Sequence, residues 1–208
     1  MNAFTNKLQE EQQFLAQWRR EGPLGILIAI INYIKTPQQY DLFASFQKTA
    51  ADEVPLELRH KALEPVKPVV TRWNSFYCAF ERAALLQGAF NAYANYHIKT
   101  TTSADALALG RNNNRPHAPA WMRSTGLSAA DWAVVTEYID LLKPLKVSTE
   151  RLEGRGKSGK YGAIYEIIPV FEYLLGALES RYRQYEHVNF DAHNEAPEDH
   201  LAINLKAA

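Results

Sequence analysis

Apolar side chains recur every three or four positions along most of this chain, the spacing that places them on one face of an α-helix. Residues 7–20 show the pattern first, with Leu8, Phe14, Leu15 and Trp18 on one side and mainly glutamine and glutamate on the other. No stretch shows clearly the alternation of apolar and polar residues that is typical of a half-buried strand. The pattern therefore predicts an all-α protein.

Proline and glycine divide the first part of the chain into helices. Gly22 and Pro23 end the first helix and open a second over residues 24–34, which is apolar on nearly every face and is predicted to be buried. Thr36 and Pro37 provide a cap and a first-turn proline for a third helix. The inward residues of that helix are predicted to be Tyr40, Phe43 and Phe46.

The next part of the chain contains an extended connection and a longer helix. A short helix is predicted over residues 56–63, and Pro65 and Pro68 favour an extended backbone after it. From Asn74, one helix is predicted to continue to about Tyr96. Its inward residues are Phe76, Tyr77, Phe80, Ala83, Ala84 and Phe90. Residues 1–96 thus form a predicted N-terminal helical segment.

Residues 97–126 differ in composition, because threonine, asparagine, arginine and proline replace the regular apolar pattern. They are predicted to form a long exposed loop. Ser128 and Asp131 then match a capping box at the start of a helix that Pro144 is expected to kink or end, with a last turn to Leu152. The inward residues of this helix are predicted to be Trp132, Val135, Ile139 and Leu142.

A glycine- and lysine-rich loop separates this helix from a last long one, residues 163–185, in which Pro169 predicts a kink or a break. The predicted inward side chains are Ile164, Ile167, Ile168, Phe171, Leu174, Leu175 and Leu178. Residues 127–185 therefore form a C-terminal helical segment. Residues 186–208 are a polar tail that ends in the beginning of another helix.

Composition and charge narrow the classes of protein. Hydrophobic residues make up 47% of the chain, which is enough for a substantial core, and 23 basic residues balance 23 acidic ones. There is consequently no global basic field to attract nucleic acid, and any such contact has to be local. Cys78 is the single cysteine, residues 1–20 lack a signal-peptide core, and residues 24–34 are too short to span a bilayer. A soluble intracellular protein is expected.

The strongest chemical signal is Arg72 next to Trp73, at the start of the helix predicted from Asn74. A guanidinium group can pair with phosphate while an indole ring stacks on a base, so the pair suits a nucleic acid. The alternative interpretation is structural, because a tryptophan at the head of an amphipathic helix is commonly a core anchor.

Two other patterns are weaker. Residues 154–160 nearly match a phosphate-binding loop, but Tyr161 stands where a magnesium-binding serine or threonine is required and no strand precedes the loop. From Lys143 to Lys160, six cations oppose two acids, so Lys157 and Lys160 are candidates for contacts with DNA phosphates. The spacing of the histidines predicts no metal site, and no catalytic centre is found.

Several segments, in order, resemble the hAT family of DNA transposases, particularly the fungal copies. The most specific match is Val70-Thr71-Arg72-Trp73-Asn74-Ser75-Phe76-Tyr77, which is similar to the family's Thr-Arg-Trp-Asn-Ser-Thr-Tyr block. Residues 22–37 resemble the segment before that block. Asp131-Trp132 and Leu141-Leu142-Lys143-Pro144 resemble the "Asp-Trp … Leu-Leu-Lys-Pro" helix. The resemblance extends from residue 10 to about residue 178.

The resemblance implies an RNase H-like enzyme whose catalytic core is interrupted by an all-helical insertion domain, to which this chain would belong. In the family, the tryptophan of the block helps to stabilise a base flipped out during hairpin formation at the cut DNA end. That role passes to Trp73, with Arg72 as its phosphate-facing neighbour. The candidate nucleic-acid-binding residues are therefore Arg72, Trp73, Asn74, Lys157 and Lys160, the expected partner is the DNA of transposon ends, and the expected location is the nucleus.

The chain also departs from the family pattern. The three metal-binding acids, the N-terminal zinc finger and the C-terminal dimerisation region have no counterpart in it, and Phe76 replaces a threonine. The complete family enzyme uses a divalent metal, magnesium or manganese, whereas no cofactor, small-molecule substrate or membrane contact is expected for this chain. We expect a fragment without transposase activity of its own. The alternative is a helical protein-interaction domain with no nucleic-acid role, in which Trp73 belongs to the core.

Overall fold

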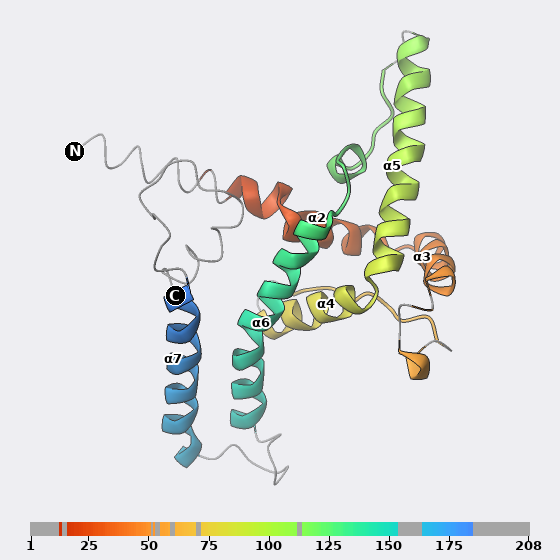
Figure 1. Ribbon diagram of the computed structural model, residues 1–208. Coiled ribbons are helices and arrows are strands. Elements are labelled where there is room, and N and C mark those ends of the chain that lie inside the picture. Colours follow the sequence, from red (N-terminus) through yellow and green to blue (C-terminus); the bar gives the residue numbers. More distant parts are fainter. Residues whose placement is uncertain are drawn as a thin grey trace, which may run out of the picture.

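The computed structural model describes residues 13, 16–50, 52, 55–58, 61–69, 72–111, 114–153 and 164–184. Within these ranges the chain is helical and has no β-strand, so the predicted all-α class is confirmed (Figure 1). The elements are α2 (Pro23–Tyr33), α3 (Pro37–Thr49), η2 (Leu56–Leu58), α4 (Trp73–Leu85), α5 (Gln87–Gly110), η3 (Ala120–Arg123), α6 (Ala129–Leu152), η4 (Ile164–Glu166) and α7 (Ile167–Gln184).

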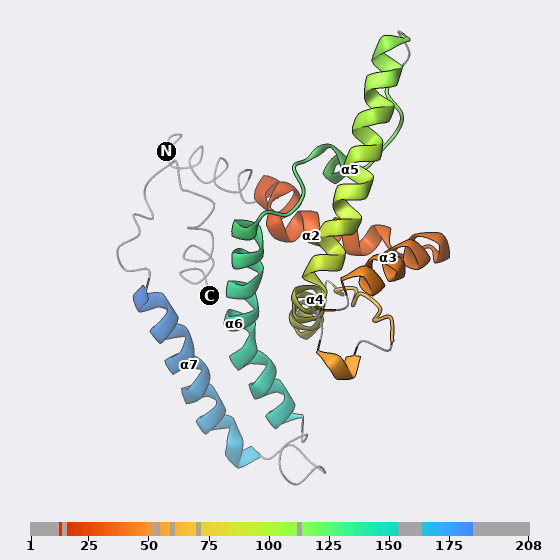
Figure 2. The ribbon, with the colours of Figure 1, turned by 45° about the vertical axis from the view of Figure 1, so that its right-hand side comes forward.

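Helices α2 to α6 and the turn η3 share one hydrophobic core. Helix α4 packs on α6 and α3 packs on α5, while α6 also contacts α2 and α7 (Figures 1 and 2). Phe43 and Phe90 are fully buried, and their ring centroids lie 4.9 Å apart. Trp132 and Val135 of α6 belong to the same core cluster. The two helical segments predicted from the sequence are therefore packed together.

Two helices begin with the caps that the sequence predicts. The Thr36 side chain accepts a hydrogen bond from the Gln39 backbone N–H at 3.4 Å, and Pro37 occupies the first turn of α3. At α6, the Ser128 hydroxyl accepts from the Asp131 N–H at 3.2 Å, and the Asp131 carboxylate accepts from the Ser128 N–H at 2.7 Å. This reciprocal capping box satisfies two backbone donors that the helix itself leaves unpaired.

The single helix predicted from Asn74 to about Tyr96 is interrupted. Its backbone leaves helical geometry at Leu86, which is the C-cap of α4 and immediately precedes α5. Leu86 is buried, and the glycine at position 88 lowers the intrinsic preference for a continuous helix. Of the short helix predicted over residues 56–63, residues 56–58 form the single turn η2 and residues 61–63 are not helical, while residues 59 and 60 lie outside the described ranges.

The exposed loop predicted over residues 97–126 is wrong in two places. Helix α5 continues to Gly110, and Trp121 and Met122 in η3 are buried. The polar composition misled the prediction because one side of this helical stretch still faces the core, where the Thr101 hydroxyl contacts the Met122 sulfur at 3.6 Å. The opposite side faces solvent, where a polar residue in a helix is tolerated.

Helix α6 does not end at Pro144 but runs on to Leu152, with the proline inside it. A proline removes one backbone donor from a helix, but packing on neighbouring helices stabilises both flanks, here through α4 and α7. In α7, by contrast, Pro169 lies in the first turn, where the missing donor costs little because the first-turn N–H groups have no partner within the helix. The kink or break predicted there is replaced by a helix start at Ile167.

The inward face predicted for the last helix is right only in part, because Leu174 and Leu178 are half-buried while Ile167, Ile168, Phe171 and Leu175 are exposed. Val170 is the buried side chain of α7, whereas Ile168 is 70% exposed, Phe171 57% and Leu175 58%. Apolar periodicity predicts the helix correctly, but it does not show whether another element packs on the apolar face of that helix. Figures 1 and 2 show α7 beside α6 at the margin of the described fold.

Candidate nucleic-acid interface at the start of helix α4

The extended segment 61–69 leads the chain to the Arg-Trp block and is fixed to the helices beneath it. The Gln47 side chain of α3 makes two hydrogen bonds with the Leu63 backbone, donating to its carbonyl at 2.8 Å and accepting from its N–H at 2.9 Å. The Arg82 guanidinium of α4 donates to the Glu64 carbonyl at 2.9 Å. These side chains supply hydrogen-bond partners for backbone groups of a stretch that lies outside any helix or strand.

Ser75 of α4 links the end of this segment to Arg72. The Arg72 N–H donates to the Val69 carbonyl at 2.9 Å. The Ser75 hydroxyl accepts from the Val69 N–H at 2.7 Å and lies 2.6 Å from the Arg72 carbonyl, to which it donates. Side-chain and backbone hydrogen bonds thus join Val69, Arg72 and Ser75, so the backbone position of Arg72 is defined.

Two features make the surroundings of Arg72 electropositive, namely its own guanidinium group and the N-terminus of α4. The Arg72 side chain is exposed, and its backbone is extended as the N-cap residue of α4. The first turn of α4 contains no acidic residue, and no side chain caps it. A helix N-terminus carries partial positive charge on its unpaired N–H groups, so the guanidinium and the helix end act in the same direction on a nearby anion.

The other predicted site residues are placed to different extents. Trp73 is the first residue of α4, but its side chain is not among those described. Asn74 is half-buried, and its buried Oδ1 makes no hydrogen bond within the described part of the chain. Lys157 and Lys160 lie outside the described residues. The structure therefore brings Arg72, Trp73 and Asn74 together at one helix end and leaves the two lysines unplaced.

Two cations of the basic run from Lys143 onward already interact with side chains of the protein itself. The Lys146 ammonium lies 4.6 Å from the centroid of the Tyr77 ring and 4.0 Å from a Glu150 oxygen. Arg151 donates to Glu166 at 2.7 Å. Paired cations retain less attraction for phosphate than the simple charge count of the sequence indicates.

Tyr77 lies in the interior next to this run. It is buried and donates to the Glu81 carboxylate at 2.8 Å. Burial, together with the adjacent carboxylate, raises the pKa of Tyr77 to about 12. The phenol therefore stays protonated at any physiological pH and serves as a structural donor.

Sequence reasoning missed two features of this region. Ser75 has a recognisable signal, because a serine three residues after a turn residue commonly bonds back to the backbone. The proximity of Lys35 to Lys67 has no signal in the sequence, because only the fold brings the two lysines together.

Within the ranges that the structure describes, no three His, Cys, Asp or Glu side chains are grouped so that they could hold a metal ion. None of the described helices is long and apolar enough to cross a membrane. No protein-family model, curated protein or solved structure matches the chain.

Proposed function

We propose that this chain is part of a hAT-like transposase and contributes a DNA contact during transposition through Arg72 and Trp73. It would belong to the helical insertion domain of the RNase H-like enzyme, act in the nucleus and engage the ends of the transposon. The chain has no catalytic role alone, because the metal-binding acids that the complete enzyme would use with magnesium or manganese lie elsewhere.

The observation that carries this proposal is the exposed Arg72, whose backbone carbonyl is bonded by Ser75, at a helix N-terminus without an acidic residue in its first turn. A phosphate at this position would meet a guanidinium and a helix end together. Trp73 follows directly, so its indole would offer a stacking surface to an unpaired base beside that phosphate. The family resemblance of residues 70–77 assigns the same division of roles.

The first experiment measures binding of fluorescent DNA with an unpaired terminal base, across a series of salt concentrations. The variant Arg72→Ala is expected to weaken binding and to lower the slope of log K against log salt by about one, because one phosphate contact is lost. Arg111→Ala is the matched control, since Arg111 is an exposed arginine at the far end of α5. Equal behaviour of the two variants would contradict the proposal.

The second experiment separates the tryptophan's role from that of the fold. Trp73→Ala is expected to cost about 1–3 kcal/mol of binding free energy for DNA with an unpaired base, and much less for a blunt duplex. Circular dichroism should show unchanged helicity. A loss of helicity together with binding would instead identify Trp73 as a core residue.

The alternative function is a helical protein-interaction domain without a nucleic-acid role. The observation that favours it is the exposure of large apolar side chains on α7, including Ile168, Phe171 and Leu175. Under this alternative, DNA binding is weak in the unaltered protein and insensitive to Arg72→Ala, while Trp73→Ala unfolds the chain.

A further inference from the structure

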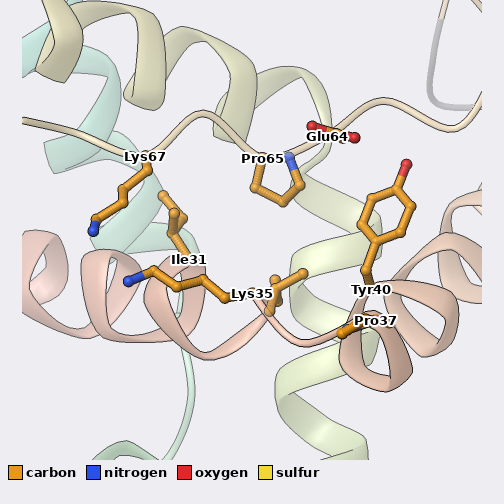
Figure 3. Close-up of a pocket in the computed structure, with 8 residues that line it drawn as sticks. Ile31, Lys35, Pro37, Tyr40, Glu64, Pro65 and Lys67 are labelled. Atoms are coloured by element: carbon orange, nitrogen blue, oxygen red, sulfur yellow. The ribbon is translucent and has the colours of Figure 1, made fainter.

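A surface pocket lies between the turn that joins α2 to α3 and the extended segment 61–69. Its volume is about 410 Å³, within the range of small-molecule sites. It is lined by Ile31, Ile34, Lys35, Pro37, Tyr40, Glu64, Pro65 and Lys67 (Figure 3). Four of these lining residues are apolar, and the other four carry a polar or charged group.

The polar groups are divided between the two ends of the pocket. Figure 3 shows the ammonium groups of Lys35 and Lys67 extending to one end, with Glu64 and Tyr40 at the other. Tyr40 directs its hydroxyl toward the Ala62 carbonyl at 3.4 Å. Among the lining side chains, the one carboxylate is therefore remote from the two cations.

The two lysines interact with each other. The proximity of the Lys67 ammonium lowers the pKa of Lys35, as expected when two like charges share one site. Both side chains are exposed, so either could turn into solvent, but both converge on the pocket end. An anion placed between them would relieve the repulsion and accept hydrogen bonds from both.

We propose that Lys35 and Lys67 bind the terminal phosphate of a phosphomonoester whose apolar or planar body lies against Ile31, Pro37 and Pro65. A phosphomonoester carries a charge between −1.5 and −2 near neutral pH, which matches two ammonium groups better than the single charge of a phosphodiester. The apolar walls would bury the organic part of the same ligand. This site is separate from Arg72 and Trp73 and does not depend on the proposed function.

Such a group has two sources: a free small phosphomonoester, or the 5′-phosphate at a nucleic-acid end. Both present the same dianion, and they differ in what is attached to it. The test uses inorganic phosphate and phenyl phosphate as probes for the site itself, and oligonucleotides with and without a 5′-phosphate to identify the source.

The central measurement is calorimetric or NMR titration of the full chain with phenyl phosphate at constant ionic strength, with phenol as the uncharged comparison. We expect saturable binding of phenyl phosphate, weaker binding of inorganic phosphate and none of phenol. Lys35→Gln and Lys67→Gln should each weaken phenyl phosphate binding at least about tenfold, the effect of losing one charge-assisted hydrogen bond. Lys99→Gln, which neutralises an exposed lysine of α5, should leave it unchanged.

The site would be overturned by the absence of saturable phenyl phosphate binding, or by equal binding of phenyl phosphate to the two pocket variants and Lys99→Gln. The proximity of the two lysines is tested separately, because Lys67→Gln should raise the pKa of Lys35 toward its ordinary value, which NMR measures directly. A Lys35 pKa that does not move would show that the lysines are not neighbours, and would also overturn the proposal.

The oligonucleotide comparison identifies which of the two sources supplies the phosphate. Tighter binding of the 5′-phosphorylated strand that is lost in Lys67→Gln supports the site with a nucleic-acid end as ligand. Equal binding of both strands, together with phenyl phosphate binding, supports it with a free phosphomonoester. Arg72→Ala should bind phenyl phosphate normally, so failure of the DNA contact and failure of this pocket are distinguishable.

Discussion

At the scale of single residues, His97 is set in a cluster of aromatic rings. Its Nε2 lies 3.1 Å from the Gln39 Oε1, which also accepts from the Tyr93 hydroxyl at 2.7 Å. Since an amide oxygen only accepts, Nε2 carries the ring's proton. The rings of Tyr33 and Tyr93 lie edge-on to the imidazole, with centroids 5.5 and 4.6 Å away. All of these neighbours are neutral.

This environment makes stability depend on pH. Burial lowers the pKa of His97, so below its ordinary value of about 6.5 the unfolded chain binds a proton more readily than the folded one. The contribution of neutral His97 to the free energy of unfolding is therefore fully present above about pH 6.5. It is lost as the pH falls from there toward the lowered pKa of the folded state. Urea unfolding at pH 7.5, 6.5 and 5.5 should show decreasing free energy of unfolding.

The matched variants are His97→Gln and His117→Gln. Removing the half-buried His97 should flatten the fall in unfolding free energy between pH 7.5 and 5.5, while removing the exposed His117 should leave it as it is. An unchanged slope in His97→Gln would show that other groups control the acid sensitivity.

Ser75 is the second residue whose effect can be measured alone. Ser75→Ala removes the hydroxyl that joins the Val69 N–H to the Arg72 carbonyl, so it should lower the free energy of unfolding by about 1 kcal/mol. Ser45→Ala is the control, because the exposed Ser45 hydroxyl only bonds back to the Leu42 carbonyl within α3. That change should be neutral within about 0.5 kcal/mol. Equal losses in both variants would show that the Ser75 hydroxyl does not stabilise the link between Val69 and Arg72.

At the scale of elements, Arg123 ties the segment after α5 back onto that helix. It donates to both oxygens of Asp105, at 2.8 and 3.0 Å, and to the carbonyls of Pro116 and Ala118. Exposed ion pairs usually contribute little, but a two-point arginine pair that also satisfies backbone carbonyls has the geometry of the stronger cases. It positions the chain so that Trp121 and Met122 enter the core.

Arg123→Ala should therefore lower the melting temperature more than Arg111→Ala, which removes an arginine at the end of the same helix. The Arg123 guanidinium lowers the pKa of Asp105, so this contribution is present at neutral pH and is lost as the pH falls below about 3.8 through the lowered value. A double-mutant cycle with Asp105→Asn checks the pairing. Additive losses in the cycle would mean that the two side chains act independently.

At the scale of the whole molecule, α7 is attached to the fold by few buried groups. Val170 is 1% exposed, and Arg181 lies 3.5 Å from Asp140 of α6. Most of the other large apolar side chains of α7 face away from the described helices. Its packing should therefore depend strongly on Val170 and weakly on the exposed apolar positions such as Leu175.

Val170→Ala is expected to lower the free energy of unfolding by about 1–3 kcal/mol, because it leaves a cavity at a buried position. Leu175→Ala removes more apolar volume but from an exposed site, so its effect should remain within about 0.5 kcal/mol. Denaturant titration of both variants tests this contrast. A larger loss for Leu175→Ala would show that the exposed face of α7 is covered in solution.

Local sequence was enough to predict the helical class, the caps at Thr36 and Ser128 and the contribution of the apolar second helix to the core. These follow from local spacing and from short-range hydrogen bonds, which the sequence displays directly. It also singled out Arg72, whose exposed place at a helix start is now described, while the assignment to a transposase stays a prediction.

The positions of helix breaks and the choice of buried helix faces, by contrast, depend on tertiary packing. The helix breaks at Leu86 although the apolar pattern continues there, whereas α6 continues past Pro144. The polar stretch after His97 is helical as far as Gly110 and has one side that faces the core. The sequence predicts an apolar face for α7, but it does not indicate that much of this face is exposed. The pairing of Lys35 with Lys67 was equally hidden, because long-range neighbours depend on how helices pack rather than on local spacing.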